Sequence, residues 1–234
     1  MVICMAQYKY LLWDIDGTVL DFNAAEKAAI KTLFAEFGFG ECSDEMISEY
    51  SAINVKYWQA MERGEITKPQ VLIGRFREFF KLKGLPLEFA EKFNSRYQVT
   101  LGDTIVFLDD SYNILCRLKD KYTLAAITNG TKDAQTKKLS RSGLDQVFDY
   151  IFISEDLGVE KPGKAFFDTA LSAMNIQDRT EVLIIGDSLT SDIRGGVVSG
   201  IDTCWYNPHH AQNTSGEPVT YEISDLHEIN DILN

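Results

Sequence analysis

The chain has 234 residues, of which 35 are acidic and 23 are basic, so its net charge at pH 7 is −12. This length predicts one or two domains with a sizeable core. Because long-range repulsion opposes binding to other polyanions, we expect neither a nucleic-acid polymer nor an anionic membrane surface as a partner. A small anionic substrate can still bind where local positive groups override that field.

The four cysteines are scattered without CxxC spacing, which argues against a disulfide framework and a zinc site: Cys4, Cys42, Cys116 and Cys204. The segment from Met1 to Ala6 is apolar but short and lacks a basic n-region, so we do not expect a signal peptide. No uncharged apolar run reaches the length that spans a bilayer. These features predict a cytoplasmic protein.

Short apolar runs rich in β-branched and aromatic residues predict buried strands at 8–13, 122–127, 150–153, 182–185 and 201–206. Segments of helical period lie between the later runs, at 112–121, 132–142, 165–174 and 190–199. Strands and helices that alternate in this way form βαβ units. The chain is therefore predicted to be an α/β protein with a doubly wound, Rossmann-like parallel sheet.

Residues 22–102 interrupt this alternation, because they contain helical patterns and no convincing strand. Glycine and proline divide the stretch into about four helices, at 38–40, Gly64, Gly84 and Pro86. We expect a core domain formed by 1–21 and 103–234 and a helical cap domain formed by 22–102. A cap inserted at the carboxyl edge of the sheet, where such folds bind ligands, can exclude water and select substrates.

Carboxylates follow two of the predicted strands. Asp14 and Asp16 end the first run, and Asp187 and Asp192 follow the run at 182–185. An acidic pair after one strand is often only a turn, but two buried strands that both end in carboxylates indicate a hard-cation site, since buried charge needs compensation. Mg²⁺ fits best, because it prefers oxygen ligands shared between a few carboxylates and a phosphate.

Two further segments supply groups that favour an anion. Thr128, Asn129 and Gly130 close the second core strand just before a helix, whose N-terminal N–H groups attract negative charge. Lys161 offers a fixed cation in a turn before another helix. Taken singly, each segment is usually a plain turn or a solvated loop.

In this order the four segments resemble the signature of the haloacid dehalogenase (HAD) superfamily: Asp-x-Asp-x-Thr, a strand-terminal Thr, a Lys and Gly-Asp-x4-Asp. The resemblance implies that Asp14 is a nucleophile, Asp16 a general acid and base, and Thr128 and Lys161 phosphate binders. Asn129 is expected to bind the substrate next to them. It also implies that Mg²⁺ is held by the Asp14 carboxylate, the Asp16 backbone carbonyl and Asp187. Asp192 would contribute directly or through water.

The cap sequence carries a second resemblance. Asn54, Trp58, the segment 64–67 and Arg75, together with 153–159 and 204–210, resemble the bacterial house-cleaning pyrimidine 5′-nucleotidases of this superfamily. This implies hydrolysis of nucleoside 5′-monophosphates, non-standard pyrimidines included, with Asn54, Trp58 and Arg75 contacting the substrate.

Aromatic side chains at helical spacing most often form a bundle core, which we expect for Phe76 and Phe80. We expect His209 and His210 to lie in a solvated loop or to contact the cap, not to bind a metal.

Other functions are compatible with the same core motifs. A sugar-phosphate or phosphoglycolate-type phosphatase would differ in its cap, and a phosphomutase would return the phosphoryl group to a sugar. A dehalogenase needs neither Mg²⁺ nor Asp16, and a non-catalytic binding module needs none of the four segments. The partner is expected to be a small phosphorylated molecule, and the protein a monomer or a homodimer.

Overall fold

The computed structural model describes residues 8–233. Within them the strands form one parallel sheet in the order β3-β2-β1-β4-β5-β6. The strands are β1 (Tyr10–Trp13), β2 (Thr123–Thr128), β3 (Tyr150–Ile153), β4 (Val182–Gly186), β5 (Asp202–Tyr206) and β6 (Tyr221–Ile223). The predicted doubly wound α/β fold is confirmed. The expectations for Met1 to Ala6 and for Cys4 concern residues outside this range.

Apolar runs that are buried on both faces explain why the central strands were predictable. Leu11, Leu12 and Trp13 of β1 are fully buried between β2 and β4. Each of the five predicted strands is present, with ends displaced by at most two residues. Strand β6 was not predicted, because it is a three-residue edge strand in which Ile223 alone is buried.

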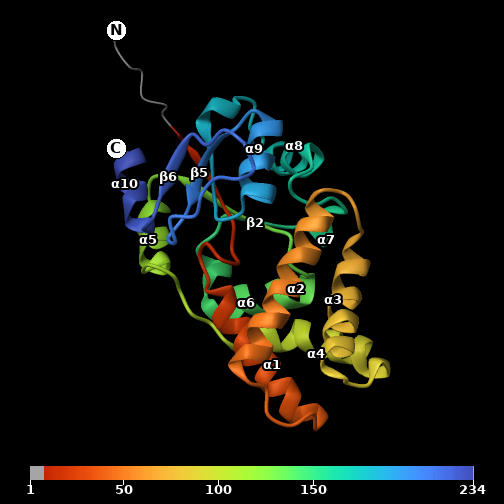
Figure 1. The fold of residues 1–234 in the computed structure, drawn as a ribbon. Helices are drawn as coiled ribbons and strands as arrows, with labels where there is room; N and C mark the ends of the chain where they lie inside the picture. The colour runs from red at the N-terminus through yellow and green to blue at the C-terminus, as the bar shows by residue number, and fades with distance from the viewer. Residues whose placement is uncertain (1–7, 234) are drawn as a thin grey trace.

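Helices cover both faces of the sheet (Figure 1). One face packs against α5 (Ser111–Leu118), part of α6 (Lys132–Ser142) and α10 (Ile229–Leu233). The other packs against α8 (Lys164–Ala173), and α9 (Arg194–Ser199) lies beside α8 and β5. A short helix, α7 (Ser154–Leu157), follows β3. The helix predicted at 190–199 begins as a π-helical turn over Leu189–Ile193 and continues as α9.

The cap stretch holds four longer helices, which gather on one side of the molecule in Figure 1. They are α1 (Phe22–Phe37), α2 (Asp44–Glu62), α3 (Lys68–Lys83) and α4 (Ala90–Thr100). Side chains of Asp21 and Ser43 cap the first two at their N-termini. Left-handed Gly38 and Gly84 end α1 and α3.

An aromatic cluster forms the core of the cap. Phe76 and Phe80 are fully buried in it, as expected, and the Tyr50 ring stacks on Phe76 at 5.0 Å between centroids. Phe93 lies edge-on to both phenylalanines at 5.1 and 5.2 Å. The cap therefore has an apolar core of its own, separate from the clusters on the two faces of the sheet.

No helix of residues 8–233 combines the length and the apolar character needed to cross a membrane.

We expect Phe76→Ala to lower the free energy of unfolding by about 3–5 kcal/mol, because it leaves a cavity among fixed aromatic rings. Phe89→Ala serves as a control within the same cap, since Phe89 is 37 % exposed, and it should cost about 1 kcal/mol or less. Urea unfolding followed by circular dichroism measures both. Equal losses for the two variants would contradict the assignment of Phe76 to the cap core.

Candidate active site

The carboxyl ends of three neighbouring strands bring together residues that lie far apart in the sequence. Trp13 of β1 is in register with Ala126 of β2 and Ile185 of β4, so the residues that follow these strands meet at one edge of the sheet. A pocket of about 160 Å³ opens there. It is lined by Asp14, Asp16, Trp58, Glu62, Thr128, Asn129, Gly130, Lys161, Asp187, Ser188, Ser191 and Asp192.

Three carboxylates crowd the floor of this pocket. Oxygens of Asp14, Asp187 and Asp192 all lie within 4.8 Å of one another. Burial, followed by the charge of Asp192, raises the pKa of Asp187 to about 7, although Lys161 acts in the opposite direction. Burial likewise raises the pKa of Asp14 well above its ordinary value, in spite of the nearby Lys161.

Lys161 is the cation buried within this acidic cluster. Its Nζ donates to Asp14 Oδ1 at 2.7 Å, to Asp192 Oδ1 at 2.6 Å and to the Ile127 carbonyl at 3.0 Å. Burial lowers the pKa of Lys161, but Asp14 and Asp192 more than offset this and leave it above its ordinary value. The ammonium is thus held charged, with all three donors directed at fixed acceptors.

The donor set fits a hard divalent cation. One buried ammonium faces three carboxylates, so negative charge remains in excess. Burial, and after it the neighbouring carboxylates, raises the pKa of Asp14 and of Asp187. Oxygen ligands from Asp14 and Asp187 suit Mg²⁺. Asp192 has less freedom to bind it, because its Oδ1 accepts from Lys161 and its Oδ2 accepts from the Ser188 N–H at 3.2 Å.

Gly17 and Thr18 fix the distance between the two acidic segments. Gly17 has φ +96°, and a Cβ at this position would lie 2.6 Å from Asp187 Oδ2, so the close approach requires glycine. Thr18 Oγ1 accepts from the Asp187 N–H at 3.0 Å and lies 3.3 Å from Asp187 Oδ1. Thr18 was not among the predicted site residues, although the Thr of the first motif is a signal for it.

The carboxylate of Asp16 is held by helix α6. Gln135 Nε2 donates to Asp16 Oδ2 at 2.6 Å, and Lys138 forms an ion pair with Asp16 Oδ1. Gln135 and Lys138 are both almost fully buried, and no sequence pattern indicated either contact. A Cβ on Gly130 would collide with the Gln135 amide, so Gly130 leaves room for this arrangement.

Asn129 lines the pocket and also binds the protein backbone. Its Nδ2 donates to the Lys161 carbonyl at 2.8 Å, and its Oδ1 accepts from the Lys161 N–H at 2.9 Å. Asn129 therefore positions Lys161, and its predicted contact with the substrate stays a prediction. Thr128 Oγ1 accepts from the Gly130 N–H at 3.0 Å, which leaves the Thr128 hydroxyl hydrogen free to point into the pocket.

The cap contributes Trp58 and Glu62 to the pocket. They lie one turn apart on α2, so both side chains face the same way. Burial raises the pKa of Glu62 to about 7, and Thr190 of the core donates a hydrogen bond to its carboxylate. Glu62 was not predicted, although its spacing of four residues from Trp58 is a signal that could have found it.

Asn54 and Arg75, which we expected to contact the substrate, lie inside the cap instead. Both are 2 % exposed and neither lines the pocket. Asn54 Nδ2 donates to Glu26 Oε2 at 2.8 Å, and an Arg75 guanidinium nitrogen donates to Asn54 Oδ1 at 2.6 Å. The buried Glu26 carboxylate explains the difference, because it requires polar partners. The Arg75 guanidinium lies 5.9 Å from the ring centroid of Trp58, so it packs against a residue that lines the pocket.

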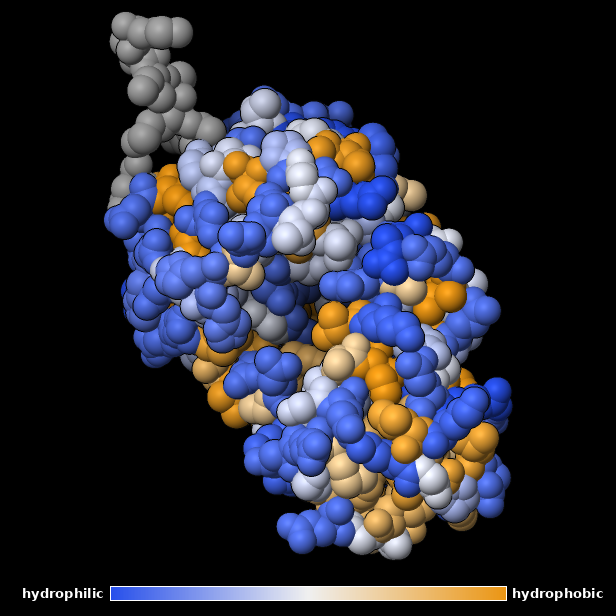
Figure 2. Space-filling model, in the orientation of Figure 1, coloured by the Kyte–Doolittle hydropathy of each residue, from blue (hydrophilic) through white to orange (hydrophobic). Residues whose placement is uncertain are grey.

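The core and cap meet at a hollow in the molecular surface (Figure 2). An acidic site with a buried lysine at the carboxyl edge of a parallel sheet, beneath a helical cap, is a candidate active site of a hydrolase. The family model for haloacid dehalogenase-like hydrolases matches residues 11–206. The chain belongs to this family, so the expected superfamily and enzyme class are confirmed.

Three relatives are similar over nearly the whole chain. The HAD hydrolase YfnB of Bacillus subtilis is 37 % identical, covering 98 % of this chain and 97 % of its own. The pyrimidine 5′-nucleotidases PynA of Streptococcus pneumoniae and YjjG of Escherichia coli are 36 % and 31 % identical, each covering 97 % of this chain and 95 % and 98 % of their own. The crystal structure of magnesium-bound YfnB, described as revealing interdomain movement, superposes with a TM-score of 0.91 at 37 % identity over 97 % of this chain and 99 % of that chain.

We expect Asp187→Asn to stabilise the metal-free protein at pH 8. The pKa of Asp187 rises from 3.8 to about 7 on folding, so its contribution to stability is present below pH 3.8 and is lost as the pH rises through about 7. Removing the ionisation should raise the free energy of unfolding by about 1 kcal/mol. For a chain of this size, that raises the thermal midpoint by about 2–4 °C. Thermal unfolding in EDTA at pH 5.5 and pH 8 measures the effect.

Adding Mg²⁺ should raise the midpoint of the wild-type protein at pH 8 and leave that of Asp187→Asn nearly unchanged. Asp120→Asn, at an exposed position of the core, is the matched control and should respond like the wild type. A full Mg²⁺ response in Asp187→Asn would contradict its assignment as a ligand.

Proposed function

We propose that the protein is a magnesium-dependent phosphatase that hydrolyses pyrimidine nucleoside 5′-monophosphates, with Asp14 as the nucleophile. The observation that carries this proposal is the contact of 2.7 Å between the Asp14 carboxylate and the Lys161 ammonium in the pocket beneath the cap. Similarity over the full chain to PynA and YjjG supports the choice of substrate.

Charge repulsion is the first obstacle to this chemistry. Each pair of like charges at about 4 Å costs roughly 4 kcal/mol at an effective dielectric constant near 20. Lys161 and the Thr128 hydroxyl offset part of that repulsion and stabilise charge on the transferring group. The Asp14 and Asp187 carboxylates and the Asp16 carbonyl would hold Mg²⁺, which would supply the remaining positive charge.

The reaction then takes place in two steps. A carboxylate oxygen of Asp14 forms a bond to phosphorus as the bond between phosphorus and the nucleoside oxygen breaks, and protonated Asp16 gives its proton to that oxygen. Water then attacks phosphorus, Asp16 takes a proton from the water, and Asp14 leaves as a carboxylate. Before either transfer, Asp16 turns away from Gln135 and Lys138 toward the pocket.

The cap selects the substrate. We assign residues 22–102 to a cap domain that closes over the pocket, and residues 1–21 and 103–234 to the catalytic core. Trp58 offers an aromatic face on which a base can stack, beside the Glu62 carboxylate. The interdomain movement described for YfnB supports a mobile cap in this protein as well.

We expect Asp14→Asn to lower kcat by more than about 10³-fold, because the nucleophile is lost. Acid quenching of the wild type during turnover should trap a phosphoenzyme, whereas the variant should trap none. Asp120→Asn should retain wild-type turnover. Phosphatase activity in Asp14→Asn close to that of the wild type, with deamidation excluded by mass spectrometry, would contradict the assignment.

We expect Trp58→Ala to lower kcat/KM for UMP and dTMP by about 10–100-fold, as the loss of one stacked base predicts. Trp58→Phe should retain most of this activity, and glucose 6-phosphate hydrolysis should change little in either variant. A phosphate-release assay over nucleotides and sugar phosphates, with Mg²⁺ or EDTA, measures these effects. A strong preference of the wild type for hexose phosphates would exclude the nucleotidase while sparing the phosphatase.

A further inference from the structure

We infer that Lys68 is a positioning residue. It sets the distance between the cap residues that line the pocket, Trp58 and Glu62, and the core loop at 128–130. This inference rests on the proposed function only for the substrates used to test it. Lys68 is the first residue of α3 and belongs to the cap, yet it is only 6 % exposed. Its buried state is unusual for lysine, which is seldom buried unless it is paired.

All the polar partners of the Lys68 ammonium belong to the core. Its Nζ donates to Ser154 Oγ at 2.8 Å and to the Gly130 carbonyl at 3.3 Å, and Glu155 Oε1 lies 3.6 Å away. Burial lowers the pKa of Lys68, and Glu155 offsets only part of that effect. A contact that served only to hold the cap in place could be made as well by apolar residues.

The acceptors of Lys68 belong to the loops that build the site. The Gly130 N–H donates to Thr128 Oγ1, while the Gly130 carbonyl accepts from Lys68. This glycine is therefore held by the phosphate-binding threonine on one side and by the cap on the other. Ser154 directly follows β3, the neighbour of β2 in the sheet. Lys68 thus spans the ends of two adjacent strands.

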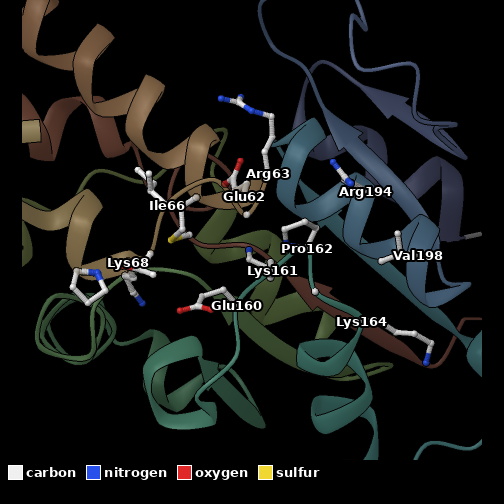
Figure 3. Close-up of a pocket in the computed structure, with 15 residues that line it drawn as sticks. Glu62, Arg63, Ile66, Lys68, Glu160, Lys161, Pro162, Lys164, Arg194 and Val198 are labelled. Atoms are coloured by element: carbon white, nitrogen blue, oxygen red, sulfur yellow. The ribbon is translucent and has the colours of Figure 1, made fainter. Parts of the chain in front are cut away.

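Lys68 is connected to the substrate-binding face of the cap by a short turn. Five residues separate it from Glu62 at the end of α2, and Trp58 lies one helical turn further back. Glu62, Lys68 and Lys161 line one cleft of about 660 Å³ between cap and core (Figure 3). A shift of Lys68 relative to Gly130 therefore moves Trp58 relative to the phosphate site.

Substrates that reach the cap should depend on Lys68, and substrates that do not should be nearly indifferent to it. We expect Lys68→Met to lower kcat/KM for UMP by about 10-fold or more, mainly through KM, since the base would meet a misplaced Trp58. Acetyl phosphate has a leaving group too small to reach the cap, and its kcat/KM should change by less than about threefold. Lys68→Arg, which keeps the charge, should recover part of the UMP activity.

Lys56→Met is the matched control, because Lys56 is an exposed cap lysine whose ion pair with Glu78 lies within the cap. Lys56→Met should leave kcat/KM for both UMP and acetyl phosphate at the wild-type values. Equal losses for UMP and acetyl phosphate in Lys68→Met would show general damage to the enzyme and overturn the inference. Unchanged values for both substrates would overturn it too.

A direct measurement of cap position keeps the test independent of activity. Spin labels at Ser95→Cys in α4 and Ser172→Cys in α8, both at exposed positions, report the distance between cap and core once Cys4 and Cys116 are replaced by serine. Lys68→Met should broaden the distance distribution, whereas Lys56→Met should not. Identical distributions in the two variants would overturn the inference, even if the wild type failed to hydrolyse UMP and the proposed function were wrong.

Discussion

The rest of this structure depends on the excess of negative charge at the carboxyl edge of the sheet. Asp14, Asp187 and Asp192 meet within 4.8 Å of one another, and Lys161 is the ammonium buried with them. Desolvating these charges is unfavourable unless each has a partner. Much of the surrounding structure supplies such partners or fixes their position, as Asn129 does by holding both backbone polar groups of Lys161.

The sheet and the acidic floor of the site could be predicted from sequence because both depend on local pattern. A strand buried on both faces is a continuous apolar run, and the first residues after such runs lie at one edge of a parallel sheet. Asp14, Thr128 and Asp187 were found in this way. The same reasoning missed β6, because a three-residue edge strand with one buried side chain carries almost no periodic signal.

The partners of polar side chains could not be predicted, because they are set by distances in the folded chain. Asp16 is paired with Lys138, 122 residues away, and nothing near either residue indicates this. The charged, multiply donating side chain of Arg75 is of a type that often binds ligands. It lies inside the cap, however, where the buried Glu26–Asn54 pair requires a donor. The type of side chain shows that a buried residue needs a polar partner. Only the fold determines whether a substrate or another side chain is that partner.

Polar contacts join cap and core at both ends of their boundary, and an apolar contact is added at one of them. At the end formed by α2 and α3 the contacts are polar, made by Glu62 with Thr190 and by Lys68 with Ser154. At the end formed by α4 and α6, Thr131 donates to Gln98 at 2.8 Å, and Ala134 also belongs to the apolar cluster of the cap. Water can replace hydrogen bonds at modest net cost, whereas separating apolar surfaces is unfavourable throughout. Separating cap from core is therefore less favourable at the α4–α6 end, where the apolar contact adds to the polar ones.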